Sequence, residues 1–298
     1  MIDRIVNHLE TGASSPFGGP STRRAFLRRG TVAVGASLLA GCLDTRPSPE
    51  STSKPAIIGH RGCAAEHPEN TTEAIEAAAT AADAVEIDLR RCGTGDIVVF
   101  HDETLDRLTA EHGRVDETPC EAVLGLEVGE SGQRIPTLRE AFDAVSSDVP
   151  LVLDLKESGL VEDVLHLHAG YDHDLLLSSF HTEVIEEIRA VDPTVSTAYI
   201  VRESLANRAL RPVVPGLPSV MYLPENVTAL VERTVELGCE AIHPRYELCL
   251  RTDLVEKAHA EGLRVEAWTI TTTEEFEALR AVGVDGVISD VCAALSEE

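Results

Sequence analysis

The sequence predicts an α/β protein built on a closed parallel barrel of eight strands, each followed by a helix, the (β/α)8 architecture. Short apolar segments rich in β-branched residues alternate with helical segments along almost the whole chain from residue 56 onward. Alternation sustained over this length favours a parallel sheet. Without residues 1–41, which are assigned below to a signal peptide, 257 residues remain. That length is close to the roughly 250 residues typical of such a barrel.

The first segment of the chain is expected to be an export signal that is not part of the fold. Residues 22–28, Thr-Arg-Arg-Ala-Phe-Leu-Arg, read as a twin-arginine signal, and the apolar stretch 31–40 follows. This stretch is about half the length needed to span a bilayer. Leu39-Ala40-Gly41-Cys42 resembles a lipobox, which predicts cleavage before Cys42 and lipidation of that cysteine. A plain signal without a lipid is the alternative.

These features divide the chain into a signal peptide at 1–41, a flexible tether at 42–55 rich in Ser, Thr and Pro, and one barrel domain at 56–298. The predicted location is the outer face of the cell membrane, where the lipid on Cys42 holds the protein. No other membrane contact is expected.

Within the domain, each strand is identified by its apolar run and each helix by its helix-forming composition. The strand candidates end at His60, Asp88, Lys156, Ser179, Ile200, Pro244, Thr269 and Asp290. The helix candidates cover 71–82, 137–145, 160–167, 182–190, 227–237, 253–261 and 273–282, several of them opening with Thr or Asp. Residues 102–134 read as a small insertion and residues 201–226 as an irregular loop with a short helix.

The second strand is expected to turn back as a hairpin. Residues 92–96 form a turn, and a hairpin centred between Thr94 and Gly95 would place His101 opposite Asp88. Alternation along this strand puts Glu86 and Asp88 on the same face. Two neighbouring carboxylates repel each other unless a cation lies between them. With Arg61, whose guanidinium suits phosphate oxygens, this grouping points to phosphodiester chemistry.

At this point the chain resembles the glycerophosphodiester phosphodiesterase family. Its motifs occur here in the family's order: His60-Arg61-Gly62, Pro68-Glu69-Asn70-Thr71, Glu86-Ile87-Asp88, His101-Asp102, Ile135-Pro136-Thr137-Leu138, Asp154-Leu155-Lys156, Ser179-Phe180, Trp268-Thr269 and Asp285-Gly286-Val287-Ile288-Ser289-Asp290. Each motif is weak alone, but nine in order over residues 56–292 are specific. The resemblance implies metal-dependent hydrolysis of a glycerophosphodiester to glycerol phosphate and an alcohol.

The resemblance also implies roles for particular residues. His60 and His101 would be the acid and base, in an order that the sequence does not decide. Glu86, Asp88 and Asp154 would bind the metal, although the family has Glu where this chain has Asp154. An all-oxygen set suits Ca²⁺ or Mg²⁺, and transition metals remain possible. Arg61, Lys156 and Trp268 would bind the phosphate and line the substrate site. Glu69 and Asn70 would either support the site or cap the following helix.

Two rival functions remain open. One is a phospholipase D-like or lysophospholipase D-like enzyme that acts on a bulkier lipid. The other is a catalytically inactive surface binding lipoprotein, which the departures at Asp154 and at Thr271, where the family has Asn, would fit. The sequence predicts neither the alcohol that is released nor the oligomeric state.

The formal net charge of the chain is −26, which excludes nucleic acid as a partner. Residues 1–41 hold five basic and two acidic residues, so the remainder holds 20 basic and 49 acidic residues. This excess of acid, with few lysines, is typical of a halophilic protein.

The remaining cysteines and histidines are expected to be structural. After Cys42, six cysteines remain without C-x-x-C spacing, and they are predicted to be buried thiols, with a Cys63–Cys92 disulfide as the less favoured alternative. The histidines predicted to be surface or packing residues are His67, His112, His166, His168, His173, His181, His243 and His259.

Overall fold

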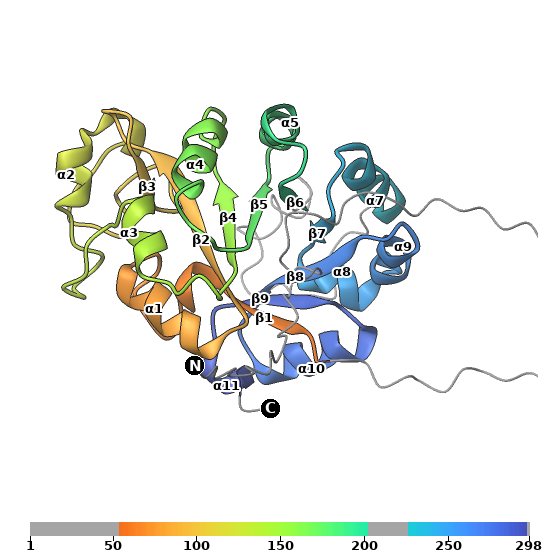
Figure 1. The fold of residues 1–298 in the computed structure, drawn as a ribbon. Coiled ribbons are helices and arrows are strands. Elements are labelled where there is room, and N and C mark those ends of the chain that lie inside the picture. Colours follow the sequence, from red (N-terminus) through yellow and green to blue (C-terminus); the bar gives the residue numbers. More distant parts are fainter. Residues whose placement is uncertain (1–53, 202–225, 297–298) are drawn as a thin grey trace, which may run out of the picture.

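A computed structural model describes residues 54–201 and 226–296, and these residues form a closed barrel with helices around it (Figure 1). The barrel strands are β1 (Ala56–Gly59), β2 (Ala84–Arg91), β4 (Leu151–Leu155), β5 (Leu175–Ser179), β6 (Ser196–Ile200), β7 (Ala241–His243), β8 (Arg264–Ile270) and β9 (Gly286–Ser289). Each strand is parallel to its neighbours, and β1 pairs with both β2 and β9, which closes the sheet. The predicted (β/α)8 fold, or TIM barrel, is confirmed.

All seven predicted helices are present, with ends that differ by at most two residues from those expected. They are α1 (Thr72–Ala81), α3 (Leu138–Asp143), α4 (Val161–His168), α5 (Thr182–Val191), α7 (Val227–Glu236), α9 (Leu254–Ala260) and α10 (Thr273–Val282). The side chains of Thr71, Thr137 and Thr272 each accept a backbone N–H in the first turn, which fixes where α1, α3 and α10 begin. Asn70 is therefore not the cap of α1. The short helices α8 (Tyr246–Arg251) and α11 (Ala293–Ser296) were not anticipated.

The interior of the barrel has an apolar layer below a polar one. The apolar layer consists of Ile58, Ala84, Val152, Leu176, Ala198, Ala241 and Ile288, with Trp268 packed against it. Because alternate residues of a strand face the same side, the residues two positions further along also point inward. From β1 to β7 these include His60, Glu86, Asp154, Ser178, Ile200 and His243. All of these except Ile200 are polar, so the alternation of the strands places a set of polar side chains at the carboxyl end of the barrel.

The hairpin after β2 forms in a different register from the one predicted. Strand β3 (Ile97–Val99) runs antiparallel to β2, and Leu89 pairs with Val99. The turn holds three residues between Cys92 and Asp96, with Gly95 at a φ of +109° that favours glycine. Phe100, not His101, therefore pairs with Asp88, whose carbonyl accepts the Phe100 N–H at 2.9 Å.

The insertion at residues 102–134 forms a small core of its own beside the barrel, at the side where β3 lies (Figure 1). It contains the 3₁₀ turn η2 (Val115–Glu117) and the helix α2 (Cys120–Leu124). Phe100, Leu105 and Val123 are buried in this core. The apolar side chains that the insertion carries are thus used for packing.

The structure contains two disulfides, which corrects the expectation of buried thiols and the alternative Cys63–Cys92 pair. Cys63 is bonded to Cys292, and Cys92 is bonded to Cys120. Strand β2 extends three residues past Asp88, which carries Cys92 away from the barrel rim toward the insertion. Cys63 instead meets Cys292 because β1 and β9 are neighbours and both residues follow the ends of these strands. Cys239 and Cys249 are free and buried, as expected.

Several expectations fall outside the described residues. These are the signal peptide at 1–41, the lipidation site Cys42, most of the tether, and nearly all of the loop at 201–226. Within residues 54–201 and 226–296, none of the helices has the length and apolar character to cross a bilayer.

Candidate active site

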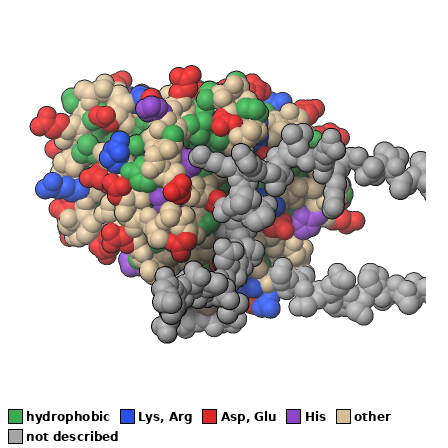
Figure 2. Space-filling model, viewed as in Figure 1, with side chains coloured by type: hydrophobic (Ala, Val, Ile, Leu, Met, Phe, Trp, Pro, Cys, Tyr) green, Lys and Arg blue, Asp and Glu red, His purple; other side chains and the backbone are tan. Residues whose placement is uncertain are grey.

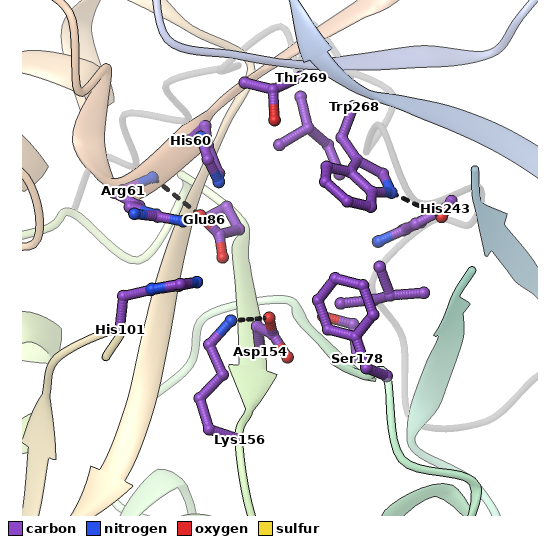
Figure 3. A pocket seen from close by; sticks show the side chains of 13 residues that line it. His60, Arg61, Glu86, His101, Asp154, Lys156, Ser178, His243, Trp268 and Thr269 are labelled. Atoms are coloured by element: carbon purple, nitrogen blue, oxygen red, sulfur yellow. Dashed lines mark hydrogen bonds and ion pairs between the residues drawn. The ribbon is translucent and has the colours of Figure 1, made fainter. Parts of the chain in front are cut away.

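A pocket with about 460 Å³ of empty space, part of it open to solvent, lies at the carboxyl end of the barrel (Figure 3). One side is charged and the other largely aromatic and apolar. The charged side consists of His60, Arg61, Glu86, His101, Asp154 and Lys156. The other side consists of Ser178, Phe180, Ile200, His243, Trp268, Thr269 and Ile288. Seven of the residues singled out from the sequence therefore line one pocket, although they come from five strands or the loops that follow them.

Three buried carboxylates lie close together at the charged side, and two of them, Glu86 and Asp154, line the pocket. Glu86, Asp88 and Asp154 are 5%, 1% and 3% exposed, and one oxygen of each lies within 4.8 Å of the others. Burial and the negative charge of Asp88 raise the pKa of Glu86 well above its ordinary value. Burial opposes ionisation of Asp88 as well, but the Lys156 and Arg61 cations outweigh it and hold the pKa of Asp88 far below its usual range.

Lys156 supplies positive charge to this cluster. Its ammonium nitrogen lies 2.6 Å from Oδ1 of Asp88 and also donates to Asp154 (Figure 3). Burial lowers the pKa of Lys156, but the three carboxylates more than compensate and raise it above its ordinary value. Lys156 is therefore charged at neutral pH.

The cluster also has the donor set of a divalent-cation site. All three residues offer carboxylate oxygens, which hard cations such as Ca²⁺ and Mg²⁺ prefer. Oδ1 of Asp154 is buried and accepts no hydrogen bond from the part of the chain that the structure describes. A buried oxygen without a partner is costly, and a cation would satisfy it. The carboxylates thus fit a metal, and the shorter side chain at Asp154 still reaches the cluster.

Each of the two histidines is held by an aspartate through its Nδ1 atom. Nδ1 of His60 lies 2.6 Å from Asp290, and Nδ1 of His101 lies 2.5 Å from Asp102. Figure 3 shows both rings turned into the pocket from the same side. His101 lines the pocket despite the shift in hairpin register. In the sequence, Asp290 ends the last strand candidate and the last motif.

The pKa values on this side of the pocket favour a neutral His101. Burial, together with the positive charges of Lys156 and Arg61, lowers the pKa of His101 below 6.5, although Asp88 and Asp102 act in the opposite direction. Burial would raise the pKa of Asp102, but hydrogen bonds from Arg107 and His101 lower it to about 2. An ionised Asp102 can only accept, so Nδ1 of His101 carries a proton and Nε2 is the free acceptor.

Arg61 is fixed by three acidic groups. Its backbone N–H donates to Glu86 at 2.8 Å, its Nη1 to Glu69 at 2.9 Å, and its Nε lies 3.2 Å from Asp88. Two hydrogen bonds join Asn70 to Asp88. The side-chain amide of Asn70 donates to the Asp88 carboxylate, and the backbone N–H of Asp88 donates to Oδ1 of Asn70. Glu69 and Asn70 thus contact the site directly, although neither lines the pocket.

The other side of the pocket contains residues that sequence reasoning missed. Phe180 meets Trp268 edge to face, with ring centroids 5.5 Å apart, and Nε1 of Trp268 donates to the carbonyl of His243. His243 was predicted to be a surface or packing residue, yet its buried ring lines the pocket and its Nε2 bonds Glu266 at 2.7 Å. The signal was available: His243 lies two residues after the inward-facing Ala241 on a short strand.

Comparison with known proteins places this geometry in context. Residues 60–294 match the model of the glycerophosphoryl diester phosphodiesterase family. A glycerophosphodiester phosphodiesterase of Caldanaerobacter subterraneus subsp. tengcongensis is 28% identical over 244 residues, 80% of this chain and 94% of that protein. Glycerophosphodiester phosphodiesterase 1 of Bos taurus is 28% identical over 249 residues, 74% of this chain and 73% of that protein.

Solved structures are similar in fold as well as in sequence. A phosphodiesterase of Oleispira antarctica in complex with the product sn-glycerol-3-phosphate has a TM-score of 0.67 and 28% identity, covering 82% of this chain and 96% of that one. A glycerophosphodiester phosphodiesterase of Thermotoga maritima has a TM-score of 0.66 and 25% identity, covering 82% of this chain and 97% of that one.

Proposed function

Because this chain belongs to the glycerophosphoryl diester phosphodiesterase family, we propose that it hydrolyses glycerophosphodiesters to glycerol phosphate and an alcohol. The chain is a phosphoric diester hydrolase built on a (β/α)8 barrel. The observation that carries the proposal is a single pocket lined on one side by two aspartate-held histidines, Arg61, Lys156, Glu86 and Asp154, with the buried Asp88 next to the last two.

The proposed reaction uses this chain's residues in two steps. First, the glycerol hydroxyl next to the phosphate attacks phosphorus, while Nε2 of His101 accepts its proton, as the lowered pKa of this residue favours. His60 then protonates the oxygen of the leaving alcohol as its bond to phosphorus breaks. Second, water opens the resulting cyclic phosphate, with the two histidines in reversed roles. Arg61 and Lys156 stabilise the negative charge on the phosphate oxygens throughout.

Glu86, Asp88 and Asp154 would hold the metal that this chemistry calls for, with Ca²⁺ or Mg²⁺ as the proposed ion. Such an ion would supply Lewis acidity to the phosphate and favour loss of the hydroxyl proton. Trp268 and Phe180 would line the space for the substrate's carbon skeleton.

The test is release of glycerol phosphate from glycerophosphocholine by the purified protein in high salt. We expect EDTA to abolish release, Ca²⁺ or Mg²⁺ to restore it, and His101→Ala to lower it by roughly 10²–10⁴-fold. His112→Ala is the control, because His112 lies in the insertion and its side chain is 81% exposed. Activity that survives both EDTA and His101→Ala would refute the mechanism. Release from a lysophospholipid alone would favour the bulkier-lipid alternative.

We also propose that the protein is exported by the twin-arginine route and anchored through a lipid on Cys42. The sequence of residues 22–42 supports this proposal, and so do the two disulfides, since such bonds persist mainly in oxidising environments. If it is correct, Cys42→Ala moves the protein from the membrane fraction to the soluble fraction.

A further inference from the structure

Arg107, in the insertion after the hairpin, bonds two carboxylates that hold residues of the pocket. Its Nε donates to Oδ2 of Asp102 at 2.6 Å and its Nη2 to Oδ1 of the same residue at 3.1 Å. Its Nη1 and Nη2 donate to the two oxygens of Glu69, each at 2.8 Å. The planar guanidinium thus forms a bidentate pair of hydrogen bonds with each of the two carboxylates, a geometry that the single ammonium of a lysine cannot provide.

Each of these carboxylates has a second partner in the pocket. Asp102 accepts from Nδ1 of His101, and Oε1 of Glu69 accepts from Arg61 as well as from Arg107. A continuous path of hydrogen bonds therefore runs from His101 through Asp102, Arg107 and Glu69 to Arg61. The side chain of Arg107 is 46% exposed and does not line the pocket, so the path reaches the site from outside.

Without Arg107, both carboxylates would be less constrained. Asp102 follows His101 directly and is free to turn toward solvent, because its side chain is 23% exposed. Glu69 would keep its bond from Arg61 and could rotate together with that side chain. Arg107 also helps to keep both groups ionised, and an ionised carboxylate is the acceptor that each contact requires.

We propose that Arg107 is a positioning residue for catalysis: through Asp102 it fixes the Nδ1–H tautomer and orientation of His101, and through Glu69 it fixes the fork of Arg61. The expected effect of Arg107 on kcat rests on the proposed function, whereas its effect on the tautomer and orientation of His101 does not. It gives the insertion a role in the reaction, although the pocket contains no described residue from 102–134.

The experiment compares Arg107→Met with Arg114→Met. Arg114 lies in the same insertion, its side chain is 44% exposed, and it likewise bonds two carboxylates, both oxygens of Asp116 and one oxygen of Glu103, none of which lines the pocket. With glycerophosphocholine as substrate, we expect Arg107→Met to lower kcat by about 10–100-fold with a smaller change in KM, and Arg114→Met to leave kcat unchanged. Arg107→Lys should recover little of the loss.

A second readout needs no substrate. In nitrogen NMR of the His101 ring, assigned with His101→Gln, the unaltered protein and Arg114→Met should show the Nδ1–H tautomer at a pH where the ring is neutral. Arg107→Met should show a mixture with the Nε2–H form. An unchanged His101 tautomer in Arg107→Met would overturn the inference, as would equal losses of kcat in the two methionine variants. Absence of glycerophosphocholine hydrolysis by the unaltered protein would instead count against the proposed function, and the tautomer would still decide the role of Arg107.

Discussion

The two histidines of the pocket are oriented in the same way by aspartates that lie far apart in the chain. Asp290 follows the last strand and holds His60, whereas Asp102 follows His101 in the sequence and is itself held by Arg107. In both cases the carboxylate takes Nδ1 and leaves Nε2 for the pocket. Paired imidazoles aimed in this way suit proton transfer to and from one phosphate.

The lowered pKa of His101 has a consequence for the pH dependence of activity. A proton acceptor must be neutral, so activity should fall on the acid side only as the pH drops through this pKa, below the ordinary value of 6.5. Asp102→Asn removes a hydrogen bond that raises the pKa of His101. In this variant the acid-side fall of kcat/KM should therefore move to still lower pH, and the maximal kcat/KM should be reduced. The measurement is kcat/KM against pH.

Asp116→Asn serves as the control for this prediction, since Asp116 lies in the insertion and bonds Arg114. It should leave the profile unchanged. An acid limb above pH 6.5, or an upward shift in Asp102→Asn, would show that neutral His101 is not the acceptor.

At the scale of elements, periodicity and caps were sufficient for the eight barrel strands and seven of the helices, because both depend on local residues. The threonines at 71, 137 and 272 mark three helix starts in the sequence and in the structure. The hairpin register was missed because one extra residue in the turn reverses which face each later side chain takes. The disulfides were missed because Cys120 meets Cys92 only through the path of the insertion, which no local pattern encodes.

The site was predictable where residues follow inward-facing strand positions or belong to a motif, as Glu86, Asp154 and His60 do. His243 was missed because a lone histidine on a short apolar strand is more often a packing residue. Arg107 was missed because it acts on the pocket through other side chains, and such relations depend on the three-dimensional path of a loop.

The Cys92–Cys120 bridge should stabilise the insertion against the end of β2. It closes a loop over a separation of 28 residues, for which chain entropy predicts a contribution of about 3–4 kcal/mol. The double variant Cys92→Ala/Cys120→Ala should lower the free energy of unfolding by about that amount in urea titrations without reductant. Cys239→Ala/Cys249→Ala removes two buried cysteines that form no disulfide and is the matched control. Equal losses in both double variants would mean that the bridge contributes packing alone.

At the scale of the whole molecule, the dominant property is negative charge. The chain carries 51 acidic against 25 basic residues, and acidic side chains are scattered over the face drawn in Figure 2. Such a surface repels itself in the compact state, and salt weakens this repulsion because the screening length falls from about 10 Å at 0.1 M to about 3 Å at 1 M. The fold should therefore depend on ionic strength.

We expect the urea midpoint of unfolding to rise as KCl increases from 0.1 M to 2 M. A variant with Glu76→Gln, Glu130→Gln and Glu232→Gln, three exposed glutamates outside the first turn of any helix, should be more stable at low salt and respond less to KCl. A midpoint that is independent of salt in both proteins would contradict a destabilising role for the surface charge.

The contact between His60 and Asp290 joins the first barrel strand to the last, and the Cys63–Cys292 bond does the same three residues further on. On a ribosome, His60 is made more than two hundred residues before its partner. Neither contact can therefore form until the last barrel strand has been made, and the orientation of His60 depends on both ends of the barrel.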